Sequence, residues 1–285
     1  MFFFKVFFKI FYLIREALRN SLAFRYLKYL RILLFKPTLN RVEIETTTIC
    51  NRKCSYCPNF TVGRPEELMD EKVYYKIIDS LKRYGYKKMI SPHFYGEPLT
   101  DSRLPKLMSY TKKNLPEAKI VLFTNGDLLT INKFLELKDA GVDFFRISQH
   151  SKQLPRNVLE TIQYIRASFT NSNDILQVVN YYDMYHKNKI MENRGGLVKV
   201  RTRKQHYCDY VNNMIFDYQG NAIICCNDYK SSIIFGNIKE NEVVEIWNDK
   251  NYVKIRNLIS NGFWPYQICK ICKESLPLHD IKHLK

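Results

Sequence analysis

The sequence predicts an α/β fold: a partial barrel of the (β/α)6 type, followed by a small C-terminal domain with a β-hairpin and helices. Two observations support this prediction. Short apolar segments with strand character alternate with segments of helical period up to about residue 180, which favours βαβ units and a parallel sheet. The alternation then ends at "NRGG", near residue 195, and a hairpin pattern follows.

The predicted barrel elements follow one another at short spacing. The segment "RVEIETT" (residues 41–47) is predicted to be a strand that leads directly into a cysteine-containing loop. The next segment is predicted to be a helix with Asp70 as its N-cap and Gly85 at its C-terminal end. The later elements are predicted as strand 87–94, helix 103–114, strand 118–124, helix 130–140, strand 142–148, helix 155–168 and strand 174–180.

The C-terminal region has a different pattern. "MIFDYQGNAIICC" predicts a hairpin whose turn contains Gln219 and Gly220, and a helix is predicted from about 241 to 259. We therefore expect three parts. These are an N-terminal basic amphipathic helical segment (1–38), the barrel (39–200) and the C-terminal domain (201–285).

Polar segments stand at the predicted strand ends. The cysteine loop, "YGEP" (95–98), "TNG" (124–126) and "RISQH" (146–150) each end or directly follow a predicted strand. Ligands of β/α barrels gather at the carboxyl ends of the strands. The sequence thus predicts that these segments share one site.

The chain is strongly basic, with a formal net charge of +17. Such a charge favours an acidic partner: nucleic acid, an anionic membrane surface or a negatively charged substrate. A lysine-rich surface without a special role explains it equally well. The basic residues are spread along the chain rather than clustered, so we do not expect nucleic acid to be the partner.

The first 20 residues are rich in Phe, Ile and Leu, but Lys5 and Lys9 interrupt them. The apolar run is therefore too short to span a bilayer, and no small-residue cleavage site marks a signal peptide. A helix over residues 1–35 could lie on a membrane surface or pack over one end of the domain.

Eight cysteines fall into two groups, residues 50–57 and 208–272. This grouping favours two metal sites in a reducing compartment, so we expect a cytoplasmic protein, with membrane-surface contact as the alternative. Cys50, Cys54 and Cys57 form a set of three without a histidine among them. Three thiolates suit a cubane cluster whose fourth iron remains open, whereas structural zinc wants four ligands.

The cysteine loop resembles the signature of the radical S-adenosylmethionine (radical SAM) superfamily. The residues that carry the resemblance are Cys50, Cys54 and Cys57, with Tyr56 before the last cysteine, and Gly96, Glu97 and Pro98 at the next strand end. Tyr95 stands where the family usually has a first glycine. The family assigns SAM binding to such positions, which here also include Thr124, Asn125 and, more weakly, Ser148.

This resemblance implies a cofactor set and a reaction. SAM would chelate the fourth iron through its amino and carboxylate groups, and a reductant protein such as a flavodoxin or ferredoxin would deliver the electron. The cleaved SAM would yield a 5′-deoxyadenosyl radical that abstracts hydrogen from the substrate. The protein itself would orient these groups and exclude water.

The second cysteine group resembles the SPASM/twitch extension of radical SAM enzymes. Its marks are Cys208, Gly220 followed five positions later by Cys225, and Cys269 with Cys272. No further cysteine follows, so the shorter twitch form with one auxiliary 4Fe–4S cluster is the better match. Cys226 is an alternative ligand to Cys225, and a four-cysteine zinc knuckle is an alternative to the cluster.

Together these features predict a radical SAM enzyme that carries out a net oxidation of a sugar, cyclitol or peptide. The sequence does not choose among these substrates. A radical SAM enzyme that modifies RNA and a non-catalytic, metal-stabilised module that binds RNA or membrane are the alternatives. His93 and His150, near strand ends, are either substrate contacts or structural histidines.

Overall fold

The computed structural model describes residues 38–187, 192–200 and 207–274. The predicted N-terminal segment, and with it the question of membrane contact through residues 1–35, lies outside these residues. No helix in the described ranges is long and apolar enough to cross a membrane.

An eight-stranded sheet in the order β5-β4-β3-β2-β1-β6-β7-β8 organises the protein. Neighbouring strands from β5 to β6 are parallel, whereas the β6–β7 and β7–β8 pairs are antiparallel. The strands are β1 (Arg41–Ile44), β2 (Met89–Ser91), β3 (Lys119–Thr124), β4 (Phe144–Gln149), β5 (Leu176–Asn180), β6 (Asn213–Phe216), β7 (Asn221–Ile223) and β8 (Ile234–Asn237). The predicted partial barrel and C-terminal hairpin are thus confirmed.

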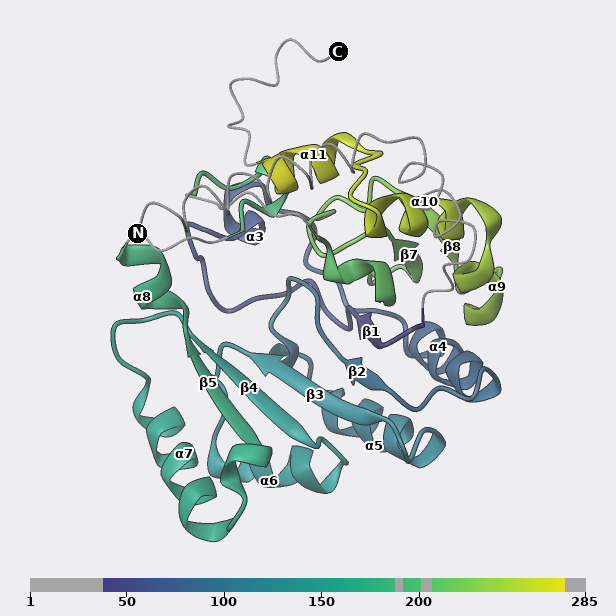
Figure 1. Cartoon of the computed structure of the whole chain (residues 1–285). Coiled ribbons are helices and arrows are strands. Elements are labelled where there is room, and N and C mark those ends of the chain that lie inside the picture. Colours follow the sequence, from purple (N-terminus) through teal and green to yellow (C-terminus); the bar gives the residue numbers. More distant parts are fainter. Residues whose placement is uncertain (1–37, 188–191, 201–206, 275–285) are drawn as a thin grey trace, which may run out of the picture.

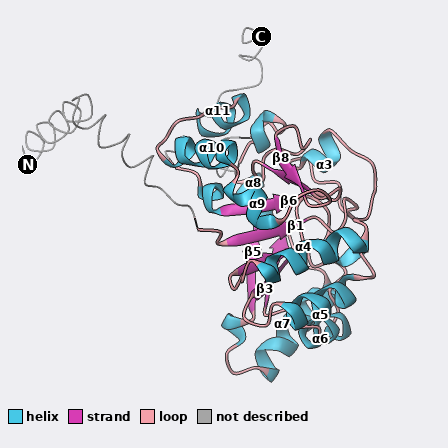
Figure 2. Cartoon of the chain, turned by 90° about the vertical axis from the view of Figure 1, so that its right-hand side faces the viewer, coloured by secondary structure: helices cyan, strands magenta, loops and turns pink. Residues whose placement is uncertain are grey.

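The helices follow the strands in the expected alternation. Figure 2 shows α4–α7 on one side of the strands, and Figure 1 shows α9–α11 gathered at the other end of the molecule, near β7 and β8. The α-helices are α3 (Pro58–Thr61), α4 (Glu71–Arg83), α5 (Leu104–Asn114), α6 (Ile131–Asp139), α7 (Arg156–Ser168), α8 (Tyr181–His186), α9 (Val243–Asn248), α10 (Lys250–Ser260) and α11 (Gln267–Glu274). Short 3-10 turns are η1 (Pro98–Thr100), η2 (Ser172–Asp174), η3 (Arg194–Gly196) and η4 (Asp209–Asn212).

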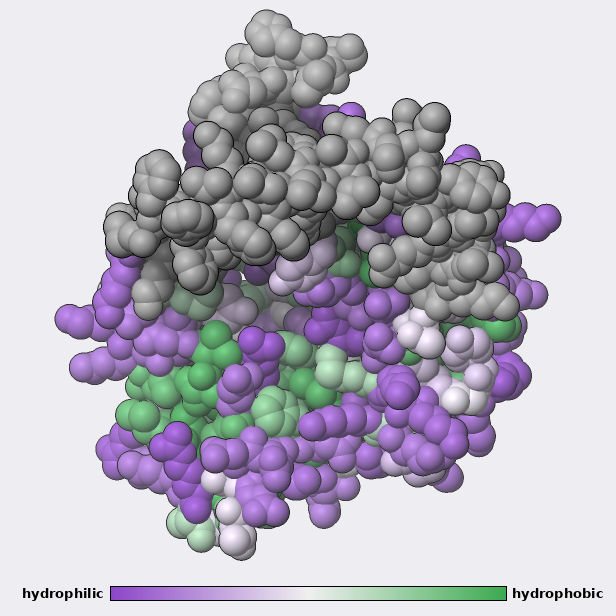
Figure 3. Space-filling model, in the orientation of Figure 1, coloured by the Kyte–Doolittle hydropathy of each residue, from purple (hydrophilic) through white to green (hydrophobic). Residues whose placement is uncertain are grey.

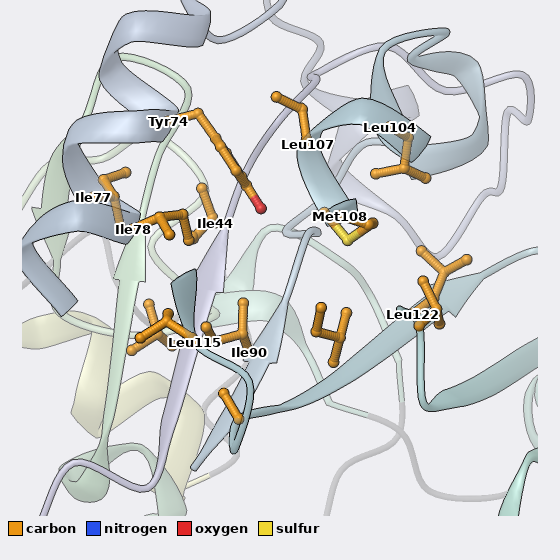
Figure 4. Packing of buried hydrophobic residues seen from close by; sticks show 14 of the residues in the cluster. Ile44, Tyr74, Ile77, Ile78, Ile90, Leu104, Leu107, Met108, Leu115 and Leu122 are labelled. Carbon is orange, nitrogen blue, oxygen red and sulfur yellow. The ribbon is translucent and has the colours of Figure 1, made fainter. Parts of the chain in front are cut away.

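The main core lies between the sheet and helices α4 and α5. Alternate residues of β1, Val42 and Ile44, are fully buried in it, while Glu43 points to the opposite face of the strand. Tyr74 of α4 is also fully buried, and its hydroxyl is satisfied by Thr111 of α5 at 2.6 Å. Figure 4 shows this packing around Ile44, Tyr74, Ile90, Leu107, Met108 and Leu122. Each such side chain contributes about 1.5–3 kcal/mol when buried.

Two predicted elements differ from the structure. The helix predicted from 241 to 259 is broken into α9 and α10, because the Asp249 carboxylate accepts a hydrogen bond from Tyr252 N at 2.9 Å and caps a new helix. The strand predicted at 87–94 is limited to β2. The predicted N-cap Asp70 and the turn at Gly220, which has φ of 86°, are confirmed.

On the face shown in Figure 3, most of the described residues around the sheet are hydrophilic. In Figure 3 an apolar area lies at the level of strands β3–β5 and is rimmed by hydrophilic residues. It lies on the side of the sheet that α4–α7 leave uncovered in Figure 2.

A buried ion pair joins the end of β1 to the segment after the cysteine loop. The Glu45 side chain is fully buried and accepts two hydrogen bonds from the Arg64 guanidinium. Arg64 also lies 4.8 Å from the ring centroid of Tyr229, which follows β7. The pair therefore connects the barrel, the cysteine loop and the C-terminal region.

We expect Arg64→Ala to lower the free energy of unfolding by about 3–5 kcal/mol, because it leaves a buried carboxylate without its partner. Arg83→Ala is the matched control, since it breaks an ion pair with Glu242 in which both side chains are more than a third exposed, and it should cost less than about 1 kcal/mol. Urea unfolding followed by circular dichroism measures both. Equal losses would contradict the structural role given to the buried pair.

Candidate functional site

The three cysteines of the first group lie in the loop between β1 and α3. Cys50, Cys54 and Cys57 are free and half-buried, and Cys57 N donates to Cys54 O at 3.0 Å, which turns the loop back on itself. All three line one pocket of about 870 Å³.

The cysteine loop is attached to the ends of β3 and β4 by polar contacts. Arg52 forms a bidentate ion pair with Asp127, at 2.6 and 2.5 Å, and donates to Ser151 Oγ at 2.9 Å. Asn125 Nδ2 donates to Asn51 Oδ1 at 2.8 Å. Bidentate arginine pairs fix orientation as well as distance. The loop is thus held against the predicted strand-end residues.

Gly96 allows the end of β2 to touch the backbone of the cysteine loop. A Cβ atom at this position would lie 2.0 Å from Thr47 O and 3.1 Å from Ile49 O. The next peptide nitrogen, Glu97 N, donates to Ile49 O at 2.8 Å. The glycine is therefore required by close backbone approach, and its φ is not in the left-handed region.

The Glu97 carboxylate is buried and accepts hydrogen bonds from neighbouring protein groups. It is 3% exposed and accepts hydrogen bonds from Thr124 Oγ1 at 2.6 Å, Asn125 N at 2.7 Å and Leu99 N at 3.1 Å. Burial raises its pKa to about 7. The side chain joins the ends of β2 and β3, so it positions the pocket wall through Thr124 and Asn125.

Tyr56 contacts the far side of the pocket. Its hydroxyl lies 2.6 Å from His150 Nδ1, and its ring lies 4.6 Å from that of Tyr185 in α8. Burial lowers the pKa of His150 to about 4, so the imidazole is neutral at pH 7. The pair is therefore a neutral hydrogen bond between the cysteine loop and the end of β4.

The structure brings together nearly all residues predicted for the first site. Pro98 is the exception, since it does not line the pocket but begins η1 and is buried. The sequence reasoning missed Arg52, Phe123, Tyr181 and Arg194, which also line the pocket; only the "NRGG" break near residue 195 pointed toward Arg194. The predicted residues that line it are Cys50, Cys54, Tyr56, Cys57, Gly96, Glu97, Thr124, Asn125 and Ser148.

The cysteines of the second group line a separate pocket of about 720 Å³. Cys225 packs in one apolar cluster with Cys208 and Cys269, whereas Cys226 packs with Phe94 and its neighbours against the barrel. The two cysteines begin a turn after β7, in which Asp228 N donates to Cys225 O at 3.1 Å. Cys225, rather than Cys226, is therefore the one whose side chain packs with Cys208 and Cys269.

Both donor sets fit iron–sulfur clusters. Burial raises the pKa of Cys50 and of Cys269 to about 11, so the thiols are neutral at pH 7 and metal uptake must release protons. Among the described residues, no three Cys, His, Asp or Glu side chains meet closely enough to share one metal ion. Cysteine thiolates are the ligands that hold iron–sulfur clusters, so the residue types of both sets fit such a group.

The surroundings of Arg256 in α10 also indicate whether an anionic cluster fits the second pocket. Arg256 is 2% exposed, and its guanidinium carbon lies 3.6 and 4.0 Å from the ring centroids of Trp247 and Tyr252, two rings set edge to face. It lines the second pocket, its Nε and Nη1 atoms have no partner, and no described carboxylate forms an ion pair with it. A buried cation needs a counter-charge. A cluster held by four thiolates is anionic and would supply it.

Two contacts connect the pockets. Tyr95, at the position of the missing first glycine, donates its hydroxyl hydrogen to Cys226 O at 2.7 Å. On the other side, Asn193 Nδ2 donates to Ile271 O of α11, the helix that carries Cys269 and Cys272, at 3.1 Å. The two sites are parts of one packed unit.

Comparisons with known proteins agree with this geometry. The radical SAM superfamily matches residues 44–176, and the SPASM iron–sulfur cluster-binding domain matches residues 208–273. The S-adenosyl-L-methionine-dependent 2-deoxy-scyllo-inosamine dehydrogenase of Niallia circulans is 29% identical over 239 residues, which are 81% of this chain and 91% of the relative.

Solved structures show the same fold. The crystal structure of BtrN in complex with AdoMet and 2-DOIA superposes with a TM-score of 0.73 and 25% identity, covering 84% of this chain and 94% of BtrN. Native anSMEcpe with bound AdoMet has a TM-score of 0.54 at 14% identity, covering 82% of this chain and 86% of that one, and supports the fold alone.

The fold and the two cysteine pockets define a radical SAM enzyme. The chain carries a radical SAM domain over residues 44–176 and a C-terminal auxiliary domain of the SPASM type over residues 208–273. Its cofactors are a SAM-binding 4Fe–4S cluster, S-adenosylmethionine and an auxiliary iron–sulfur cluster. As a radical SAM enzyme it needs a reductant and a substrate.

We expect Gly96→Ala to weaken SAM binding, because the new Cβ would push the end of β2 away from the cysteine loop at a cost of about 1–3 kcal/mol or more. Gly85→Ala is the control: its Cβ meets no atom within 4 Å, and its left-handed backbone alone costs about 1–2 kcal/mol. Calorimetric titration of the reconstituted proteins with SAM should show a loss only for Gly96→Ala. Unchanged SAM affinity in that variant would contradict the inferred close approach.

Proposed function

We propose that the protein dehydrogenates an alcohol on a cyclitol or a related polyol. The observation that carries this proposal is the similarity to the scyllo-inosamine dehydrogenase, which spans 91% of that relative and includes both cysteine regions.

We assign Cys50, Cys54 and Cys57 to the SAM-binding cluster, and Cys208, Cys225, Cys269 and Cys272 to the auxiliary cluster. When bound, these groups and SAM supply hydrogen-atom abstraction at the first site and an electron acceptor at the second. Gly96, Thr124, Asn125 and Ser148 line the first pocket and are proposed to hold SAM there.

The protein's own residues are proposed to orient the cofactors and keep water out. Glu97 fixes the pocket wall through its three hydrogen bonds. Tyr95 holds the SAM site against the auxiliary site through Cys226 O. This direct contact keeps the distance between the two sites short, as an electron transfer from substrate to the auxiliary cluster requires.

We also propose a domain boundary, a reductant and a location in the cell. We place the domain boundary near residue 200, although β6 of the C-terminal part pairs directly with β1. A flavodoxin or ferredoxin is the proposed reductant. Free cysteines in both groups favour the cytoplasm, while membrane contact through residues 1–35 stays a prediction from sequence.

Anaerobic turnover tests the proposed function. The reconstituted enzyme is incubated with SAM, dithionite and 2-deoxy-scyllo-inosamine or myo-inositol, and 5′-deoxyadenosine and ketone are quantified by mass spectrometry. Equal amounts of the two products support dehydrogenation. Release of 5′-deoxyadenosine without oxidation of any polyol offered would count against it.

The two adjacent cysteines provide a sharp prediction for the auxiliary site. Reconstituted wild type should hold about eight iron atoms per chain, and Cys225→Ala should hold about four, because one cluster loses a ligand. Cys226→Ala, one residue away and packed against the barrel, should keep about eight. The opposite order in an iron assay would assign the ligand to Cys226.

A further inference from the structure

Three arginines surround the barrel lumen beside the first pocket. Arg41 of β1 and Arg146 of β4 alternate with buried core residues, Val42 and Ile147 among them, so their side chains face the lumen. Arg194, in η3, lines the first pocket itself. We call Arg41, Arg146 and Arg194 the lumen arginines.

His93 is close enough to all three lumen arginines to be influenced by their charges. Its ring stacks on Phe123 at 4.4 Å, and its Nδ1 atom lies 2.7 Å from Ser91 Oγ. The Arg146 guanidinium lies 5.5 Å from the centroid of the same Phe123 ring. Burial, together with the charges of the three lumen arginines, lowers the pKa of His93 to about 3. The histidine therefore adds no charge, and the arginines dominate the lumen.

The lumen arginines are only partly neutralised. Arg41 Nε lies 2.9 Å from Glu43 Oε1, and Arg194 Nη1 lies 3.4 Å from Glu192 Oε2, a long contact. Arg146 has no ion-pair partner in the part of the chain that the structure describes. Burial raises the pKa of Glu43 to about 7, so this carboxylate is partly neutral near pH 7. Positive charge therefore remains in the lumen.

Arg194 is held in place by a strained backbone. Its φ is 53°, a left-handed value that non-glycine residues rarely adopt. The following Gly195 is wedged against α11, since a Cβ there would lie 2.7 Å from the Ile268 side chain. Strain of this kind persists where the surroundings enforce it, most often at functional sites. The auxiliary domain thus fixes a guanidinium at the pocket wall.

We propose that the substrate carries an anionic group, a carboxylate or a phosphate, that binds Arg146 and Arg194 in the lumen. A planar guanidinium offers paired donors that match the oxygens of either group, and a half-buried site strengthens the contact. This inference rests on the proposed dehydrogenation of a polyol and names the class of that polyol. The anion would fix the substrate between the SAM pocket and the auxiliary domain.

Calorimetry with inorganic phosphate tests the site without turnover. The reconstituted, SAM-loaded wild type is compared with Arg146→Gln, Arg194→Gln and the control Arg156→Gln, whose side chain is 93% exposed on α7. Wild type and control should bind phosphate alike, and the two lumen variants at least about tenfold more weakly. Equal binding by all four proteins, or none by the wild type, overturns the proposal.

SAM itself has a carboxylate, so its affinity is measured in the same variants. Unchanged SAM dissociation constants support a substrate role for the lumen arginines. A loss of SAM affinity that parallels the loss of phosphate binding overturns it and assigns the guanidinium to SAM.

A substrate pair separates this inference from the proposed function. In the wild type, myo-inositol 1-phosphate should be oxidised faster than myo-inositol, and Arg194→Gln should remove the difference. Equal oxidation of both compounds overturns the anionic substrate but leaves polyol dehydrogenation standing. Phosphate binding that depends on the lumen arginines, with no polyol oxidised, would support the anion site and contradict the dehydrogenase function alone.

Discussion

The close approach of Gly96 to the backbone of the cysteine loop is the constraint on which the site depends. Because residue 96 has no Cβ, Glu97 N can reach Ile49 O at 2.8 Å. The neighbouring side chains then extend in different directions. Glu97 reaches the end of β3 and Tyr95 reaches Cys226. Three consecutive residues therefore set the positions of the cysteine loop, the SAM pocket and the auxiliary domain relative to one another.

The C-terminal domain is joined to the barrel in two places. Strand β6 extends the barrel sheet directly from β1, and the hairpin continues it to β8. The auxiliary pocket is thus built on the same sheet as the SAM pocket. Contacts from α11 to the turn that holds Arg194 add a second connection on the other side. A shift of the backbone at one cofactor site can therefore displace residues at the other.

Local sequence signals predicted the parts of the site that local chemistry determines. Strand and helix periods placed the cysteine loop, "YGEP" and "TNG" at one edge of a sheet, and the structure has them in one pocket. The hairpin turn at Gly220 and the cap at Asp70 also follow from residue type. The prediction of one helix from 241 to 259 followed the apolar period alone and missed Asp249, whose residue type is typical of an N-cap.

Features that depend on contacts between residues far apart in the chain could not be predicted from local sequence patterns. The pairing of β6 with β1 joins residues far apart in sequence, and no local pattern records it. The burial of Arg256 between two aromatic rings runs against the usual exposure of arginine. The role of Arg194 depends on a backbone conformation that a helix far along the chain enforces. In each case tertiary contacts determine the outcome.

We infer that one chain holds two iron–sulfur clusters with different surroundings, only one of which binds SAM. Electron paramagnetic resonance of the dithionite-reduced, reconstituted wild type, recorded with and without SAM, tests it most directly. We predict two cluster signals, of which one shifts when SAM is added and the other does not. A single signal, or a spectrum that SAM leaves entirely unchanged, would contradict the account.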